Sequence, residues 1–216
     1  MHWADVIARD LISRTESNLI STGITPSGTL HVGTLREAIT AEAVRKSTVK
    51  AGGNVRMIYL VDSFDPLRRR YPFLPESFEA EVGKPLAYIP CPCGEHDNYA
   101  QHYIQPFLDS IQELGIHCEV LWTHEQYEQG KFADVIDTAI VNKDRVSEIL
   151  KEVSGRDLPP DFYPYSPRCE KCGRLTHAKV TGYEKPFVSY ECACGHSGKA
   201  DIRKADGKMP WRVEWA

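Results

Sequence analysis

The chain contains 216 residues, of which 42% are hydrophobic and 26% are charged, and its formal net charge is −4. These values are typical of a folded globular protein and exclude a disordered or collagen-like chain. The negative charge argues against a generic basic nucleic-acid-binding protein, although a local basic patch would suffice for an enzyme that acts on nucleic acid. No apolar run approaches the roughly 18 residues of a membrane span, and the N-terminus does not resemble a signal peptide. We therefore expect a cytoplasmic protein with no membrane partner.

The apolar pattern predicts alternating helices and strands. Helices are expected over 3–15, 32–51 and 99–114, and strands over 18–22, 55–61 and 117–122. In the first helix one face carries Trp3, Val6, Ile7 and Leu11, and in the third helix Pro106 predicts a kink or break. Residues 125–153 are expected to be largely helical. Because a strand, a crossover helix and a second strand form a βαβ unit, the sequence predicts an α/β fold with a parallel sheet.

A turn-rich segment, residues 25–34, lies between the first predicted strand and the helix that follows it. Ligands of open α/β sheets bind outside the carboxyl ends of the strands, and the amides that open a helix favour negative charge. Gly28 and Gly33 would let a phosphate or a planar ligand approach the backbone. His31 could donate to phosphate oxygens and stabilise charge in a transition state. From spacing alone, a glycine-rich turn with a capping histidine remains an alternative.

Seven cysteines, an odd number, indicate metal binding rather than full disulfide pairing. Cys91, Cys93 and His96 precede a predicted helix that carries His102 in its first turn. Cysteine and histidine side chains that converge from a loop and a helix suit tetrahedral zinc. Unligated surface residues are the alternative for this cluster.

A second cluster pairs Cys169 and Cys172 with Cys192 and Cys194, close to the spacing of a zinc ribbon. His196 could replace Cys194 as the fourth ligand. A closed site with four protein ligands has no open position, so we expect a structural rather than a catalytic zinc. Disulfide bonds are the alternative.

Four segments, in the same order, resemble class I lysyl-tRNA synthetase, the mainly archaeal form. They are Thr-Gly-Ile-Thr-Pro-Ser-Gly-Thr-Leu-His-Val-Gly from Thr22, Asp-x-Phe-Asp-Pro-Leu-Arg from Asp62, Tyr-Pro-Phe-Leu-Pro from Tyr71, and Pro-Trp-Arg-Val-x-Trp from Pro210. The first contains the Pro-Ser-Gly-x-x-His-x-Gly-x pattern of the class I His-Ile-Gly-His signature. Thr34 stands at its last position, where this family often has asparagine. The implied fold is the Rossmann-like class I catalytic core, present in part, with zinc-binding insertions.

The resemblance implies a role for individual residues. His31, Gly33 and Thr34 would be catalytic, and Pro26, Ser27 and Gly28 would bind ATP together with His31 and Gly33. The lysine pocket would include Gly23 and Thr25, with Trp211 or Trp215 also near the amino acid. Asp62, which ends the second strand, is our own assignment for the α-amino or ε-ammonium group of lysine. A turn cap is the alternative for Asp62.

The family pattern Asp-Pro-x-Gly-Cys-His-x-x-Tyr-Ala-x-His implies Cys91, Glu95, His96 and His102 as ligand positions. Here cysteine stands where aspartate is usual, and glutamate stands where cysteine is usual. Because thiolates are softer ligands than carboxylates, we expect zinc to select Cys93 over Glu95.

The resemblance implies a lysine–tRNA ligase that uses ATP, one or two zinc ions and Mg²⁺ with ATP, and whose partners are lysine and tRNA-Lys. The Lys-Met-Ser-Lys-Ser signature is missing from the sequence, so we expect an N-terminal fragment with little activity alone. Two alternatives stay open: a non-catalytic zinc-ribbon RNA-binding module, and another nucleotidyltransferase relative with the same histidine motif. The basic run Arg68–Arg70 is interpreted as a solvated or salt-paired surface, and a contact with tRNA phosphates or the phosphates of ATP is the alternative.

The expected domains follow from these assignments. Residues 1–158 would form a nucleotide-binding half with a zinc-binding loop at about 83–102. Residues 159–207 would form a zinc-ribbon-like insertion, and residues 208–216 would begin the next segment of the core.

Overall fold

The computed structural model describes residues 2–155 and 157–215, without the side chains of Trp211 and Arg212. The chain divides into two compact units, Met1–Ser63 with Ile89–Thr123, and Phe64–Tyr88 with His124–Ala216. Among the described residues, no helix has the length and apolar character needed to cross a membrane.

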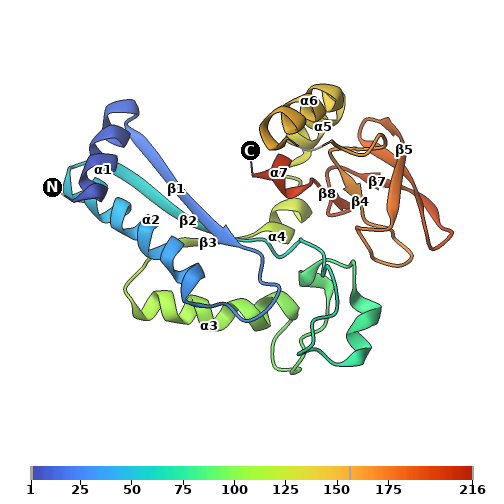
Figure 1. Cartoon of the computed structure of the whole chain (residues 1–216), viewed down its shortest axis with the longest axis horizontal. Helices are drawn as coiled ribbons and strands as arrows, with labels where there is room; N and C mark the ends of the chain where they lie inside the picture. The colour runs from blue at the N-terminus through green and yellow to red at the C-terminus, as the bar shows by residue number, and fades with distance from the viewer. Residues whose placement is uncertain (1, 156, 216) are drawn as a thin grey trace. The chain divides into compact units, whose positions relative to one another are not determined.

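The first unit is built on a three-stranded parallel sheet in the order β1-β2-β3 (Figure 1). Its strands are β1 (Ser17–Ile24), β2 (Asn54–Val61) and β3 (Glu119–Trp122). Its helices are α1 (Trp3–Arg14), α2 (Val32–Lys50) and α3 (Tyr99–Glu113). β1 and β2 are in register over their whole length, from Ser17 opposite Asn54 to Ile24 opposite Val61. The α/β fold with a parallel sheet, predicted from the apolar pattern, is therefore confirmed.

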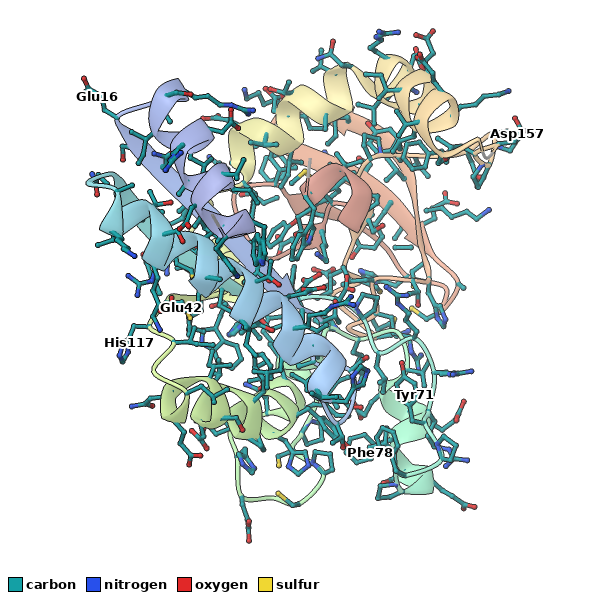
Figure 2. All side chains as sticks on the ribbon, turned by 60° about the vertical axis from the view of Figure 1, so that its left-hand side comes forward. Glu16, Glu42, Tyr71, Phe78, His117 and Asp157 are labelled. Carbon is teal, nitrogen blue, oxygen red and sulfur yellow. The ribbon has the colours of Figure 1, made fainter. Side chains whose placement is uncertain are left out.

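Helices α2 and α3 share one hydrophobic core with β2. The core of this unit joins Ala38 and Ala41 of α2, Tyr59 of β2, and Ile104 and Phe107 of α3. Glu42 of α2 (Figure 2) is only 4% exposed and accepts two hydrogen bonds from Arg45, at 2.6 and 2.8 Å.

The expected break at Pro106 is absent, because α3 continues through this residue. Proline removes one helical hydrogen bond, which costs about 3 kcal/mol in a helix interior. Buried Ile104 and Phe107 flank Pro106, so packing on the sheet outweighs the local cost.

The second unit combines two small antiparallel sheets with short helices. Its strands are β4 (Ser166–Pro167), β5 (Ala178–Glu184), β6 (Phe187–Cys192), β7 (Ser197–Asp201) and β8 (Gly207–Lys208). Its helices are η1 (Glu76–Glu81), η2 (Leu86–Tyr88), α4 (Thr123–Glu128), α5 (Ala133–Val141), α6 (Lys143–Ser154) and α7 (Trp211–Glu214). β5, β6 and β7 form one sheet, and β4 pairs with β8. Val188 and Tyr190 of β6 share a core with Ile136 and Ile140 of α5, so strands and helices stabilise one another.

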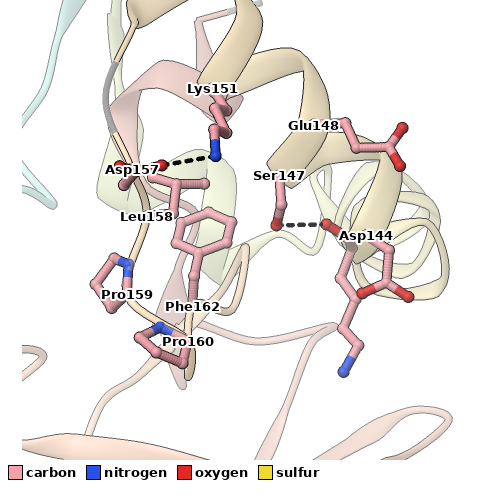
Figure 3. A pocket seen from close by; sticks show the side chains of 10 residues that line it. Asp144, Ser147, Glu148, Lys151, Asp157, Leu158, Pro159, Pro160 and Phe162 are labelled. Atoms are coloured by element: carbon pink, nitrogen blue, oxygen red, sulfur yellow. Dashed lines mark hydrogen bonds and ion pairs between the residues drawn. The ribbon is translucent and has the colours of Figure 1, made fainter.

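A hollow of about 360 Å³ lies between α6 and residues 157–162 (Figure 3). Lys151 closes one side of it through an ion pair with Asp157 at 2.7 Å. Its lining contains no residue that the sequence analysis assigned to a site.

Candidate active site and metal centres

The carboxyl ends of the three parallel strands meet at one edge of the first unit. β1 ends at Ile24 and β2 at Val61, and the Asp62 amide donates to the Ile24 carbonyl at 2.9 Å. The Asp62 carboxylate accepts from the Thr123 hydroxyl, which follows β3, at 3.1 Å. Asp62 is 1% exposed, so it is held across the ends of all three strands. These hydrogen bonds fit the turn-cap alternative for Asp62, and they also keep a carboxyl group at the edge where such sheets bind ligands.

Gly23 stands one residue before the end of β1, at a very close approach to β2. A Cβ atom at Gly23 would lie 2.2 Å from the carbonyl oxygen of Leu60. No side chain fits there without separating the strands. Strand packing therefore requires glycine at position 23, independently of the role expected for Gly23 in the lysine pocket.

The loop between β1 and α2 is tied down by hydrogen bonds at its centre. The Ser27 amide donates to the Thr25 carbonyl at 2.9 Å, and Pro26 beside them is buried. The Ser27 carbonyl accepts from the Tyr99 hydroxyl at 2.8 Å. The loop is therefore anchored to the first residue of α3.

His31 is the N-cap residue of α2. Its Nδ1 accepts a hydrogen bond from the Gly33 amide at 3.0 Å. In the neutral ring the proton is then on Nε2, which remains available as a donor. A Cβ atom at Gly33 would lie 2.7 Å from Cε1 of His31, so only glycine leaves room for this ring position. Thr34, the third expected catalytic residue, is buried in the first turn of α2.

A pocket of about 450 Å³ opens beside the His31 ring. One wall is the end of the loop and the start of α2, and the other is α3 with the loop before it. The lining residues are Thr29, Leu30, His31, Val32, Leu35, His96, His102, Tyr103, Pro106, Phe107 and Ser110. This mixture of apolar walls and a few polar groups is typical of small-molecule sites. His31 therefore presents a hydrogen-bond donor, Nε2, at the N-terminus of α2. Helix N-termini are sites where anions bind.

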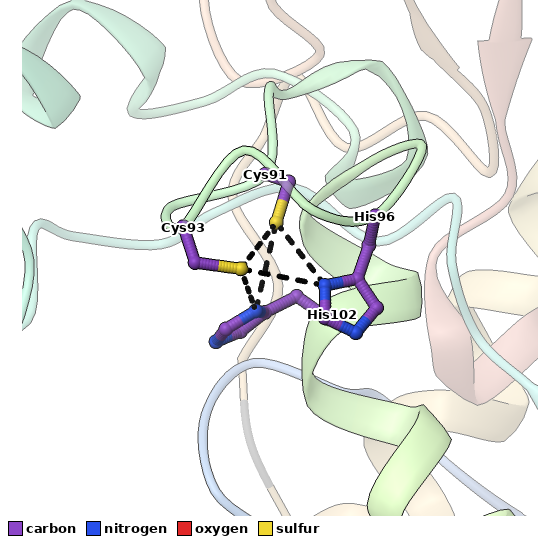
Figure 4. Close-up of side chains that lie close together, drawn as sticks. All are labelled: Cys91, Cys93, His96 and His102. Atoms are coloured by element: carbon purple, nitrogen blue, oxygen red, sulfur yellow. Dashed lines mark hydrogen bonds between the residues drawn. The ribbon is translucent and has the colours of Figure 1, made fainter.

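The first Cys/His cluster consists of Cys91, Cys93, His96 and His102 (Figure 4). The two sulfur atoms lie 3.3 Å apart, and the sulfur-to-Nδ1 distances are 3.2 to 3.5 Å. Ligand atoms around a tetrahedral zinc, at bond lengths of about 2.0–2.3 Å, are separated by roughly 3.3–3.8 Å. The donor set therefore suits zinc, and the spacings lie at the short end of this range.

Glu95, the ligand position implied by the family pattern, is exposed and does not join the described cluster, in which Cys93 takes part. Burial raises the pKa of the Cys91 thiol, but hydrogen bonds from the Cys93 side chain and from the Cys93 and His96 amides outweigh this and lower the pKa to about 6. A thiol with a lowered pKa is ready to bind a metal as thiolate.

Replacing Cys93 by serine is expected to reduce the zinc content of the chain by one equivalent, because a hydroxyl is a poor zinc ligand. Glu95→Gln is the matched control and should leave the zinc content unchanged. Both can be measured by elemental analysis after dialysis against metal-free buffer. Loss of zinc in Glu95→Gln with retention in Cys93→Ser would assign the fourth ligand to Glu95 instead.

Tyr99 was missed by the sequence analysis as a site residue. It follows the N-cap residue Asn98, whose side chain accepts from the Gln101 amide at 2.9 Å. The start of α3 thus carries both His102 of the cluster and the Tyr99 hydroxyl that holds the signature loop. The only sequence signal was the tyrosine in the family metal pattern, which does not show where its hydroxyl points.

Tyr99→Phe is expected to loosen the signature loop. The lost hydrogen bond should cost about 1 kcal/mol in the free energy of unfolding, and amide exchange across residues 25–31 should accelerate. Tyr163→Phe in the second unit serves as control and should leave exchange in this loop unchanged. Identical exchange in wild type and Tyr99→Phe would show that the hydrogen bond does not order the loop.

The second cluster consists of Cys169, Cys172, Cys192 and Cys194. The sulfurs of Cys169 and Cys194, and those of Cys172 and Cys192, lie 3.7 Å apart. This separation matches thiolates around one tetrahedral zinc, about 3.8 Å apart at a bond length near 2.3 Å, and exceeds the S–S bond of a disulfide, about 2.05 Å.

Each cysteine pair of this cluster sits on a tight turn. Gly173 and Gly195 follow the pairs with φ values of 73° and 82°, a region that glycine adopts without strain. His196, the alternative fourth ligand, contacts Glu170 through Nε2 at 2.7 Å and does not join the cluster in the described part of the chain. The closed set of four cysteines fits a structural metal.

The C-terminal residues belong to the second unit. The side chain of Trp211 lies outside the described residues, and Trp215 is 44% exposed. The helix α7, which begins at Trp211, is held by a buried ion pair of Lys208 with Glu214, and Glu214 also accepts from the Tyr127 hydroxyl at 2.7 Å.

A parallel sheet with the Pro-Ser-Gly-x-x-His-x-Gly loop after its first strand, and a helix capped by that histidine, defines the catalytic core of class I aminoacyl-tRNA synthetases. The family described as tRNA synthetases class I (K) matches residues 1–216. The chain therefore belongs to the class I lysyl-tRNA synthetase family.

Curated relatives named lysine–tRNA ligase align with the whole of this chain. The chain is 48% identical to a lysine–tRNA ligase of Methanosarcina barkeri, and the alignment covers 100% of this chain and 40% of the relative. It is also 48% identical to a lysine–tRNA ligase of Archaeoglobus fulgidus, of which it covers 44%, and 46% identical to one of Thermoplasma acidophilum, of which it covers 42%. The chain thus spans less than half the length of these relatives.

Proposed function

We propose that this chain supplies the lysine- and ATP-binding part of a lysine–tRNA ligase. The observation that carries the proposal is His31, held at the N-cap of α2 at the carboxyl end of β1 with Nε2 available beside a pocket of about 450 Å³. The family membership of the whole chain supports the same assignment. We also place the protein in the cytoplasm.

The proposed reaction activates lysine by attack of its carboxylate on the α-phosphorus of ATP, which releases pyrophosphate and leaves lysyl-adenylate. The terminal ribose hydroxyl of tRNA-Lys then takes the lysyl group. His31 would donate to the phosphate oxygens as charge moves onto the leaving pyrophosphate, and the amides at the start of α2 would add positive potential. Gly23, Thr25 and Asp62 would bind lysine, and Mg²⁺ would accompany ATP.

The two metal clusters would have separate tasks in this proposal. Zinc at the first cluster would fix the loop 91–96 to α3 and so hold one wall of the pocket, because His96 and His102 line it. Zinc at the second cluster would hold the β5–β7 sheet together. Neither needs to touch the reacting atoms.

The test is calorimetric titration of the zinc-loaded chain with lysine in the presence of ATP, and with a non-hydrolysable lysyl-adenylate analogue. We expect binding that is selective for lysine over ornithine and arginine and that is lost in Thr25→Ala. Lysine-dependent pyrophosphate exchange by the chain alone should be weak or absent, because the second class I signature is missing from its sequence.

Absence of any lysine or adenylate effect, combined with RNA binding that ATP does not change, would favour a zinc-ribbon RNA-binding module instead. Selective binding of another carboxylate with ATP would favour a different nucleotidyltransferase relative. Robust pyrophosphate exchange by this chain would contradict the expected low activity.

A further inference from the structure

An arginine and two aromatic side chains form a stacked row on the loop 68–74 of the second unit. The Tyr71 and Phe73 rings are parallel, with an interplanar angle of 1° and centroids 5.4 Å apart. Cζ of Arg69 lies 5.3 Å from the centroid of the Tyr71 ring. Phe73 is 57% exposed, so this row, Arg69–Tyr71–Phe73, is not part of a core.

The loop that carries the row is anchored at both ends. Leu67 is fully buried, and its amide and carbonyl bond Lys84 and Gly83 at 2.9 and 2.8 Å. Leu74 is 4% exposed and its amide donates to the Tyr71 carbonyl at 3.0 Å. Figure 2 shows Tyr71 on the same lobe of the unit as Phe78, the buried residue of η1. The rings are therefore displayed by a fixed backbone, which lowers the entropy cost of binding a partner.

The charges along the loop are only partly neutralised. Arg68 contacts Asp65 at 3.5 Å and Arg70 contacts Glu79 at 3.5 Å. Arg69 forms no ion pair with any carboxylate in the described part of the chain, and its one described contact is the Tyr71 ring. The row thus offers one unneutralised guanidinium and the Phe73 ring, which is 57% exposed, with the half-buried Tyr71 ring between them.

We infer that the Arg69–Tyr71–Phe73 row is a docking surface for unpaired RNA. Aromatic side chains stack on any nucleobase once it is unstacked from its neighbours, and a guanidinium beside them can pair with a phosphate. A duplex hides its base faces and would gain only the single charge. The inference extends the proposed function and rests on it for tRNA as the natural partner, since the acceptor end of tRNA is single-stranded.

The test is fluorescence anisotropy of the zinc-loaded chain with a labelled single-stranded RNA of about eight nucleotides, a length within the span of common single-strand sites. Phe73→Leu keeps the apolar volume but removes the ring, and it should weaken binding about fivefold or more. Phe73→Trp should retain binding. Val153→Ala, at an 82% exposed apolar position on α6, is the control and should bind as wild type.

Arg69→Gln tests the charge. One lost phosphate contact should make the slope of log affinity against log salt shallower by about 0.7, the value for single strands. Arg145→Gln, at an exposed arginine of α6, should leave the slope unchanged. Unchanged RNA affinity in Phe73→Leu, an unchanged slope in Arg69→Gln, or equal binding of a duplex of the same sequence would each overturn the inference.

Titration of the same samples with lysine and ATP separates this inference from the proposed function. Phe73→Leu should retain the lysine response of the wild type. RNA binding that depends on Phe73, in a chain that shows no lysine response, would contradict the proposed function and support the docking surface. A lysine response without Phe73-dependent RNA binding would support the proposed function and contradict the docking surface.

Discussion

Cys169→Ser is expected to unfold the β5–β7 module of the second unit and to remove one zinc equivalent from the chain. Cys169 is fully buried, and both Cys169 and Cys192 belong to the core that also contains Val188 and Tyr190. Structural zinc contributes about 10–16 kcal/mol of apparent binding free energy in small zinc modules, so loss of one ligand should cost at least about 5 kcal/mol. Without metal, four thiols also remain crowded at distances near 3.7 Å.

Amide hydrogen exchange and zinc analysis together measure this prediction. Exchange should rise to the unprotected rate across β5, β6 and β7, while β1 and β2 of the first unit keep their protection. Cys118→Ser is the matched control, because this cysteine belongs to neither cluster in the described chain. A Cys169→Ser protein with full zinc content and protected β6 would show that the cluster does not stabilise the sheet.

The order of helices and strands in the first unit could be predicted from the sequence because each element carries a local signal. Val55–Val61 is a nearly continuous apolar run that is followed by Asp62, and the preceding helix is terminated by Gly52–Gly53. Close cysteine spacing also predicted which cysteines would meet, since Cys169 and Cys172 share one turn. These signals act over a few residues, and tertiary contacts do not override them.

Long-range packing could not be predicted in the same way. Trp3 and Val6 lie on the apolar face expected for α1, yet they are 46% and 55% exposed, and the buried residues of the helix are Ala4 and Ala8. Small residues allow close approach of helices, and periodicity does not reveal which of two faces meets a partner. Arg174 likewise donates to the carbonyls of Val82 and Ala80, at 2.8 and 3.1 Å, and so joins segments about ninety positions apart.

The metal loop shows a third kind of limit. The family pattern pointed to position 95 and ligand softness pointed to position 93, and the choice depends on how the backbone turns at Gly94, whose φ is 77°. The left-handed turn at Gly94 lies between Cys93 and His96, whose Nδ1 is 3.4 Å from the Cys93 sulfur. The zinc ions themselves stay a prediction that the variants above test.

His31→Ser is expected to weaken binding of the lysyl-adenylate analogue tenfold or more while leaving the chain as stable as the wild type. Serine is a good N-cap residue, so its hydroxyl can accept the amide hydrogen bond that His31 Nδ1 now accepts from Gly33. Its side chain is too short to replace Nε2 as a donor in the pocket. A hydrogen bond to a charged phosphate contributes about 1.5–3 kcal/mol, so affinity should fall tenfold or more.

His31→Ala and Gly33→Ala complete the comparison. Together with His31→Ser, they distinguish the helix-capping role of His31 from its role as a hydrogen-bond donor in the pocket. His31→Ala should lose the same affinity and also about 1 kcal/mol of stability, since the N-cap is removed. Gly33→Ala keeps the imidazole but places a methyl group 2.7 Å from its Cε1, so the ring must leave its position and affinity should fall as well. Calorimetry and thermal unfolding measure both quantities. If His31→Ser retains the affinity of the wild type, His31 is only a helix cap and ATP must be bound by other residues.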